Sequence, residues 1–263
     1  NFLNRWTPSL YLSYKPLPHF NDLSLRAFYK SIFRLPTFND LYYTEVGNTR
    51  LNPETTRQFD LGFIYSHDWY WGLFRHVEIK ADGYFNLVDN KIIAIPKGSG
   101  QYRWMMMNLG KVHILGMEAT AETVLRWKRD WQLLLCLNYT YQSATDRTDP
   151  KDNDPYYGTY AGQIAYVPWH SGSVAGTLSW RQLSLNYSFV YVGERYRTSS
   201  NIPQNYEQPW YTHDLSASYR LQRKGFALVL ALECNNLFNQ QYEVIQNYPM
   251  PGRNWKGTVK VEF

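Results

Sequence analysis

The sequence predicts an all-β fold: an antiparallel transmembrane β-barrel with about eleven strands visible, forming part of a larger barrel. Three observations support this prediction. Apolar and polar residues alternate with period two along most of the 263 residues, as they do in half-buried strands. Aromatic residues make up 17% of the chain although the mean hydropathy is only -0.50, a combination that suits a barrel with a polar lumen. Long and short connections also alternate along the chain.

The predicted strands begin near residues 7, 22, 55, 76, 104, 131, 171, 183, 210, 225 and 254. In the segment 131–142, one face is apolar or aromatic and consists of Trp131, Leu133, Leu135, Leu137, Tyr139 and Tyr141. Most segments have the ~9–11 residues with which a tilted strand crosses a bilayer. In the strand near 225 we expect an apolar face toward lipid, formed by Leu228, Leu230 and Leu232. We expect the lumen face of that strand to carry Ala227, Val229 and Glu233.

The lengths of the connections test the prediction independently. Short connections are expected at 15–21, 126–130, 181–182 and 222–225, and an intermediate one at 66–76. Long connections are expected at 33–54, 89–103, 144–170, 194–209 and 239–253. Outer-membrane barrels have short turns at the periplasmic end and long loops at the external end. A soluble β-sandwich also alternates in polarity, but it has no reason to make every second connection long.

Eleven strands is an odd number, whereas single-chain bacterial barrels have even numbers. An open sheet would leave unpaired edges at 7–14 and 255–263, and such edges are not tolerated in lipid. We therefore expect that the chain does not close into a barrel by itself. Residues 1–5 do not resemble a signal peptide, so the sequence is expected to be part of a longer precursor.

Charge and cysteine content argue against two other classes of protein. The net charge is +5, but the basic residues are scattered and form no stripe that nucleic acid would bind. The two cysteines, Cys136 and Cys234, have no metal-like spacing. Neither a cofactor nor a nucleic-acid partner is expected.

Two groups of motifs point to a family. Residues 33–42 read FRLPTFNDLY and are followed by LNPE at 51–54, while NLFN at 236–239 precedes YPMPGR at 248–253. Together they resemble motifs of TonB-dependent outer-membrane receptors. The motif residues are Phe33, Arg34, Pro36, Asn52, Pro53, Glu54, Asn236, Leu237 and Phe238. The resemblance covers the whole chain as the C-terminal half of a barrel of about 22 strands, and the plug domain and the first half of the barrel lie outside it.

The resemblance implies a receptor of the bacterial cell outer membrane, and not an enzyme, that takes up a large, scarce nutrient with energy supplied through TonB. Haem receptors of this type carry a histidine between the two N-terminal motifs, but residues 37–50 contain none. Imidazole is a usual ligand of haem iron, so haem ranks third among the substrates. A corrinoid such as cobalamin ranks first and a ferric siderophore second.

The resemblance also implies several partners. They are the TonB complex through the missing N-terminal region, the barrel-assembly machinery, outer-membrane lipid and lipopolysaccharide, and the nutrient; a surface lipoprotein is a further candidate. Phe263 ends the chain, with apolar residues at every second position before it. This pattern looks like the signal read by the assembly machinery, although simple contact with lipid is an alternative.

Substrate-binding candidates lie on the long loops, where aromatic faces and guanidinium groups suit a large planar or anionic ligand. The candidates are Tyr102, Arg103, Trp104, Tyr156, Tyr157, Tyr160, Arg195, Tyr196, Arg197 and Tyr206. The alternative for each is a place in the aromatic belt at the membrane surface, or contact with lipopolysaccharide phosphates.

Weak calcium candidates lie in one of these loops, at Asp146, Asp149, Asp152 and Asp154. Carboxylate oxygens are the ligands that Ca²⁺ prefers, but the spacing does not match a known calcium loop. A solvated acidic loop is therefore the favoured interpretation.

Two other function classes stay open from the sequence. A small outer-membrane barrel enzyme, a phospholipase or a protease, would need a nucleophile with a base or paired carboxylates near one rim, and the sequence has no G-x-S-x-G motif. A passive pore or an autotransporter barrel is the other alternative. An enzyme does not explain the FRLP and NLFN motifs. A plug domain upstream would distinguish the receptor from both alternatives.

Overall fold

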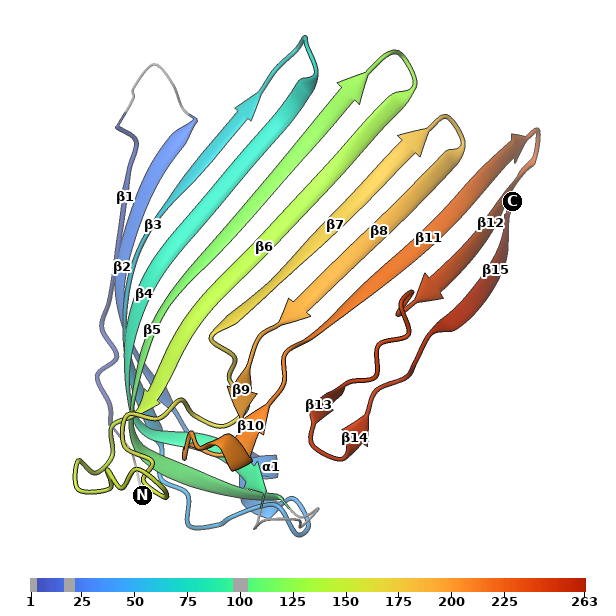
Figure 1. Ribbon diagram of the computed structural model, residues 1–263. Helices are drawn as coiled ribbons and strands as arrows, with labels where there is room; N and C mark the ends of the chain where they lie inside the picture. Colours follow the sequence, from blue (N-terminus) through green and yellow to red (C-terminus); the bar gives the residue numbers. More distant parts are fainter. Residues whose placement is uncertain (1–3, 17–21, 97–103) are drawn as a thin grey trace.

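The structure is a computed structural model that describes residues 4–16, 22–96 and 104–263. One antiparallel sheet of eleven strands dominates it, and each strand pairs with the next along the chain (Figure 1). The strands of the sheet, in spatial order, are β1 (Ser9–Tyr14), β2 (Leu23–Arg34), β3 (Glu54–Asp68), β4 (Phe74–Pro96), β5 (Trp104–Trp127), β6 (Trp131–Asp146), β7 (His170–Trp180), β8 (Leu183–Val192), β11 (Trp210–Arg223), β12 (Phe226–Asn235) and β15 (Asn254–Glu262).

The remaining elements are short and belong to the connections. They are the helix α1 (Phe38–Tyr42), the 3-10 helix η1 (Pro203–Asn205), the strand pair β9 (Arg195–Tyr196) and β10 (Tyr206–Glu207), and the pair β13 (Glu243–Ile245) and β14 (Tyr248–Pro249). No helix in the described part of the chain is long and apolar enough to cross a membrane.

The predicted number of strands and the positions at which they begin are confirmed, but two connections are shorter than predicted. The sequence predicts a loop at 89–103, yet β4 continues to Pro96 and stays paired with β5 up to Trp104. The Glu54 carboxylate contacts this extension, where its Oε2 accepts a hydrogen bond from the Ile92 N–H at 2.9 Å. The connection predicted at 66–76 is a turn of residues 69–73 only.

Long and short connections lie at opposite ends of the sheet, as predicted. Figure 1 shows the turns after β3, β5, β7 and β11 together at the top. The connections that carry α1, β9, β10, β13 and β14 lie together at the bottom. We call these the turn end and the loop end. No second sheet of comparable size packs on this one among the described residues, so the β-sandwich alternative is wrong.

The two faces of the sheet differ as the alternation predicted. Leu230 lies between Tyr219 and Val259 in one row across the strands. In the next row, on the opposite face, Val229 lies between Arg220 and Lys260. On the apolar face, Leu230 is 44% exposed and Val259 is 70% exposed. A soluble monomer rarely leaves so continuous an apolar face in water, so this face is the lipid-facing one and the polar face lines the lumen.

Aromatic residues mark the borders of the apolar band. At the turn end, the Trp131 ring stacks between Trp127 and Trp180, with centroids at 5.9 and 5.5 Å. Farther along the same face of β6, the Tyr141 ring lies 5.2 Å from His170 at the loop end. With a rise of ~3.3 Å per residue and a tilt of ~40°, the path from Trp131 to Tyr141 spans ~25 Å along the membrane normal. That height matches the apolar band of outer-membrane barrels.

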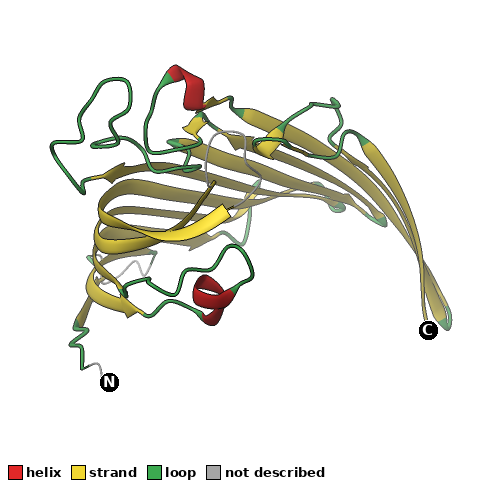
Figure 2. Ribbon diagram, turned by 90° about the horizontal axis from the view of Figure 1, so that it is seen from below, coloured by secondary structure: helices red, strands yellow, loops and turns green. Residues whose placement is uncertain are grey.

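The sheet is open. Among the described residues, β1 pairs only with β2 and β15 pairs only with β12. Figure 2 shows a curved wall with the N-terminus and the C-terminus at opposite edges. The expectation that residues 255–263 do not pair with residues 7–14 is therefore confirmed.

Candidate ligand site at the loop end

The connection between β6 and β7 folds back onto the lumen face of the wall. Ile164 from this connection packs against buried residues of β4, β5 and β6, namely Val88, Val112, Ile114 and Ala144. These residues are at most 9% exposed, and they form the main apolar cluster of the described structure. The connection is thereby held against the lumen face near the loop end.

A buried glutamine fixes the same connection. Gln163 is fully buried. Its Oε1 accepts the Ala144 N–H at 2.8 Å, and its Nε2 donates to the carbonyl oxygens of Gln142 at 2.9 Å and Val167 at 3.2 Å. Its own backbone N–H donates to the side chain of Asn201 in the next connection. Because a buried amide is costly unless its hydrogen bonds are made, Gln163 stabilises one arrangement of the two connections.

Arg195 joins the β8–β11 connection to the β12–β15 connection at the loop end. It is 2% exposed and donates from Nη1 to the Gln208 carbonyl at 3.0 Å. From Nη2 it donates to the carbonyls of Glu243 at 2.7 Å and Val244 at 3.1 Å. Burial lowers the pKa of Arg195, while nearby Glu207 and Tyr166 raise it. In this arrangement the guanidinium clamps the β9–β10 pair to β13.

Arg197 and Glu207 complete this clamp. Arg197 Nε lies 3.3 Å from Glu207 Oε1, and the same guanidinium donates to the side chain of Gln246 and to the Gln204 carbonyl. Burial raises the pKa of the Glu207 carboxyl, and the charges of Arg197 and Arg195 partly counter that rise. Both arginines are predicted ligand contacts, but each guanidinium is bonded to groups of the protein itself. The buried Arg197 Nε has the ion-pair contact with Glu207 and no hydrogen bond.

A hollow of about 430 Å³ opens between these clamped segments. It is lined by aromatic, amide and carboxylate side chains and two prolines, from Tyr206, Glu207, Gln208, Pro209, Trp210, Gln240, Gln241, Tyr242, Glu243 and Pro249. The rings of Trp210 and Tyr242 stack at 4.6 Å. The lining, all of it in the described part of the chain, includes no basic side chain. Sequence reasoning identified only Tyr206 of this set, because the set combines two connections that are distant in the sequence.

The N-terminal motifs have structural roles at the loop end. Glu54 is 7% exposed and forms ion pairs with Lys91 at 3.4 Å and Arg34 at 3.6 Å. The Asn52 N–H donates to Asn108 Oδ1 at 2.8 Å, and Asn108 Nδ2 donates back to the Asn52 carbonyl at 3.1 Å. Pro53 contributes its carbonyl as an acceptor for Asn90. The motif thus anchors the start of β3 to the extended hairpin of β4 and β5.

The first motif borders the helix α1. The Phe33 ring lies 5.5 Å from the Arg5 guanidinium carbon. After Pro36, Thr37 caps α1: its Oγ1 accepts the Asp40 N–H at 3.2 Å, and Asp40 accepts the Thr37 N–H at 2.8 Å. This capping box starts the helix where the strand β2 has ended.

The C-terminal motif closes the last connection. Asn236 is 5% exposed and has a positive φ of 51°, a conformation that asparagine tolerates. Its side chain accepts the Gln240 N–H at 2.8 Å and donates to the Gln240 carbonyl, also at 2.8 Å. The Leu237 N–H donates to the His213 carbonyl at 2.7 Å. Phe238 is exposed and meets the His213 ring edge-on at 4.8 Å.

The other candidate contacts are dispersed. Tyr102 and Arg103 lie outside the described residues, and the Trp104 ring lies 5.9 Å from that of Tyr166. Tyr156 and Tyr157 are 71% and 81% exposed. The Tyr160 ring lies 5.3 Å from the Arg147 guanidinium carbon, and the Tyr196 ring lies 5.9 Å from that of Tyr206. Arg195, Tyr196 and Tyr206 come together in the β9–β10 pair. Arg197 follows β9 directly, and its N–H donates to the Asn205 carbonyl at 2.9 Å.

The four aspartates of the acidic connection were weak calcium candidates. No group of three or more potential ligands for a metal ion occurs in the described residues. Asp146 is buried at 3% exposure and its Oδ1 accepts the Thr148 N–H at 2.8 Å. The other three carboxylates accept nearby backbone N–H groups in the same way, at Asp149, Asp152 and Asp154. The interpretation as a solvated loop is therefore wrong for Asp146, which is the buried last residue of β6.

Comparison with known proteins identifies the family. The family model described as "TonB dependent receptor-like, beta-barrel" matches residues 1–237. The chain belongs to this family. Its members are transport receptors of the bacterial outer membrane and are not enzymes. The enzyme alternative is therefore excluded by family membership.

The relatives of this chain include vitamin B12 transporters. The vitamin B12 transporter BtuB of Vibrio vulnificus (strain YJ016) is 28% identical over 88% of this chain. The BtuB of Photobacterium profundum is 24% identical over 92% of this chain. The receptor chain spans about a third of the length of these relatives, namely 33% and 36%.

Solved structures show the same fold. The ferric citrate transporter FecA, in its unliganded form, superimposes with a TM-score of 0.68 at 14% identity, over 97% of this chain and 38% of its own. The copper transporter OprC gives a TM-score of 0.65 at 18% identity, over 97% of this chain and 40% of its own. At such identities the likeness concerns the fold alone.

Proposed function

We propose that this chain forms the C-terminal part of the barrel of a TonB-dependent receptor that imports a large, scarce nutrient across the outer membrane. Family membership and the two BtuB relatives support the transport role. The open sheet supports completion by further strands of the same protein, since lipid does not tolerate the two free edges. TonB would act on a plug domain that lies outside this sequence.

Among nutrients, we propose a corrinoid first, and the composition of the hollow at the loop end is the observation that carries this choice. Its lining offers three glutamine amides and a Trp210–Tyr242 stack next to two glutamates. A corrinoid is a broad ring with neutral amide groups around its edge, which such amides and aromatic faces can bind by hydrogen bonds and stacking. The relatives named as vitamin B12 transporters support the same choice.

A ferric siderophore ranks second because its chelate is commonly anionic. An anionic ligand would be expected to meet basic side chains, yet Arg195 and Arg197 direct their donors into the loop clamps. Haem ranks third. The described histidines toward the loop end are His113, His170 and His213, and all three lie on the lipid-facing side. His170 and His213 bond the hydroxyls of Tyr139 and Tyr187 at 2.8 and 2.7 Å.

Binding by the full-length receptor tests this proposal. Purified receptor should bind cyanocobalamin, and Trp210→Ala should weaken that binding by removing the stacked face. Trp180→Ala, at the turn end of the lipid-facing side, is the matched control and should leave the affinity unchanged. Tight binding of a ferric siderophore without binding of cyanocobalamin would overturn the choice of substrate while leaving the transport role standing.

Cells lacking TonB provide a separate test of the transport role. They should keep surface binding of the nutrient and lose its accumulation in the cell. Accumulation that continues without TonB would favour a passive pore.

Phe263 is proposed as the assembly signal, and its replacement should reduce the amount of folded receptor in the membrane without changing the affinity of the receptor that does fold.

A further inference from the structure

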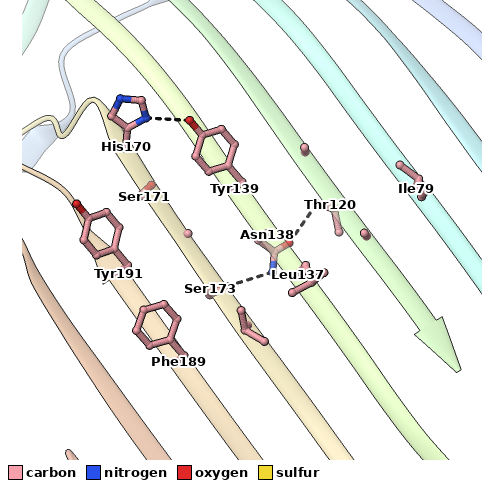
Figure 3. Close-up of a pocket in the computed structure, with 14 residues that line it drawn as sticks. Ile79, Thr120, Leu137, Asn138, Tyr139, His170, Ser171, Ser173, Phe189 and Tyr191 are labelled. Carbon is pink, nitrogen blue, oxygen red and sulfur yellow. Dashed lines mark hydrogen bonds between the residues drawn. The ribbon is translucent and has the colours of Figure 1, made fainter. Parts of the chain in front are cut away.

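A second hollow lies on the lipid-facing side of the wall, opposite to the lumen (Figure 3). Its volume is about 410 Å³, which falls in the range of small-molecule sites. Two rows of residues across the strands form its floor. One row contains Ala119, Tyr139, Gly172 and Tyr191, and the other contains Ile79, Ala121, Leu137, Val174 and Phe189.

Small residues set between large ones create this hollow. Ala119 and Gly172 flank Tyr139 in the first row, and Ala121 lies between Ile79 and Leu137 in the second. At Gly172 a Cβ atom would come within 2.9 Å of the Asn138 carbonyl oxygen. The wall therefore cannot fill this part of the hollow with a side chain of its own unless the backbone moves.

The position of the hollow determines what can enter it. The row of Tyr141 and His170 borders the apolar band at the loop end. The hollow begins next to this row, on the side away from the loop end, and extends into the band itself. In an outer-membrane receptor, this part of the lipid-facing side meets the hydrocarbon of the outer leaflet. Its lining surface is almost all apolar, so it matches hydrocarbon and excludes a polar ligand.

The end of the hollow that is nearer the loop end carries polar side chains. Figure 3 shows His170 beside Tyr139 at one end, with Tyr191 and Phe189 on the neighbouring strand. The Tyr139 hydroxyl bonds His170 Nδ1 at 2.8 Å, which leaves the Nε2 side of an exposed imidazole turned away from that bond. A polar group above an apolar hollow is the arrangement that orients an amphiphile with its head toward the membrane surface.

We propose that this hollow is a lipid site that holds one acyl chain of an outer-leaflet lipid, with the polar head beside His170 and Tyr139. The site is independent of the nutrient, because it lies on the face opposite to the lumen. A chain seated there would contact side chains of five consecutive strands, from β4 to β8. It would thereby differ from the passing lipids that cover the rest of the face.

Photolabelling of the full-length receptor tests the proposal. The receptor is reconstituted in vesicles that contain a phosphatidylethanolamine with a diazirine at the end of one acyl chain, and the adducts are mapped after irradiation. We expect adducts to concentrate on the segments 119–121 and 172–174, several-fold above the rest of the lipid-facing side. Ala121→Leu fills the hollow and should remove most of this excess.

Ala27→Leu is the matched control, since Ala27 lies on the same side of the sheet in β2, between Leu12 and Leu61. It should leave the labelling at 119–121 unchanged, and the heat-dependent gel mobility of both variants should show that they are folded. Adducts spread evenly over the lipid-facing side in the wild type would overturn the proposal. Cross-links between two receptor copies through the hollow would also overturn it, because a second copy would then be the occupant.

Discussion

The wall and the loop end of this receptor chain are stabilised in different ways. In the wall, each interior strand pairs with a neighbour on both sides, so stability is shared among many similar backbone hydrogen bonds. At the loop end, a few buried polar side chains such as Arg195 and Gln163 each hold several segments together. A substitution in the wall should therefore change stability mainly when it changes the polarity of the side chain. A substitution in a clamp should instead release a whole connection.

The largest expected effect is that of a charge placed on the lipid-facing side. Leu230→Arg should lower the free energy of unfolding by ~2–4 kcal/mol if Leu230 lies near mid-membrane, because the charge must leave water. The measurement is the urea midpoint of the full-length receptor in lipid vesicles. Ala231→Arg is the control, since Ala231 faces the lumen between Ser218 and Thr258. An unchanged midpoint for Leu230→Arg would show that this residue is not at mid-membrane.

A smaller and local effect is expected at the clamp. Arg195→Ala removes three hydrogen bonds to backbone carbonyls. Loss of a charged hydrogen-bonding group of this kind costs about 1.5–3 kcal/mol, here in the local opening of the connections and not in the unfolding of the wall. Hydrogen exchange should accelerate in the β9–β10 pair and in β13 while the wall stays protected. Arg181→Ala is the control, because its ion pair with Asp130 at 3.0 Å is on the surface and is expected to contribute ~0–1 kcal/mol. Equal exchange in the two variants would show that Arg195 does not hold the connections.

The smallest expected effect is a dependence on pH at the same clamp. Burial raises the pKa of Glu207 in the folded state, so the folded clamp binds this proton more tightly than the unfolded chain does. The contribution of this carboxyl is complete below its ordinary pKa and is lost as the pH rises through the raised value. After correction for intrinsic rates, exchange in the β9–β10 pair should be slower at acidic pH than at neutral pH. Glu207→Gln should abolish this difference, and a difference that persists would assign it to another group.

Some of the polar anchors at the loop end could be predicted from the sequence, and others could not. Glu54 and Asn236 were recognised as family motif residues, and the structure shows each as a buried polar anchor. Their neighbours along the chain do not reveal their partners, because Ile92 is 38 residues from Glu54. Gln163 gave no signal at all, since a single glutamine in a polar connection looks like any other.

The alternation of residues by itself determined the strands, their faces and the polarity of the connections. This was possible because side chains along a strand point alternately to opposite faces, so that a local pattern assigns residues such as Leu230 and Val229 to their sides. Only the tertiary structure decided which side chains build the mouth. Arg195 meets Glu243 across 48 residues and Gln163 meets Asn201 across 38, and contacts over such separations follow no period. They depend on where the wall places the ends of its strands, and that placement exists only after the sheet has formed.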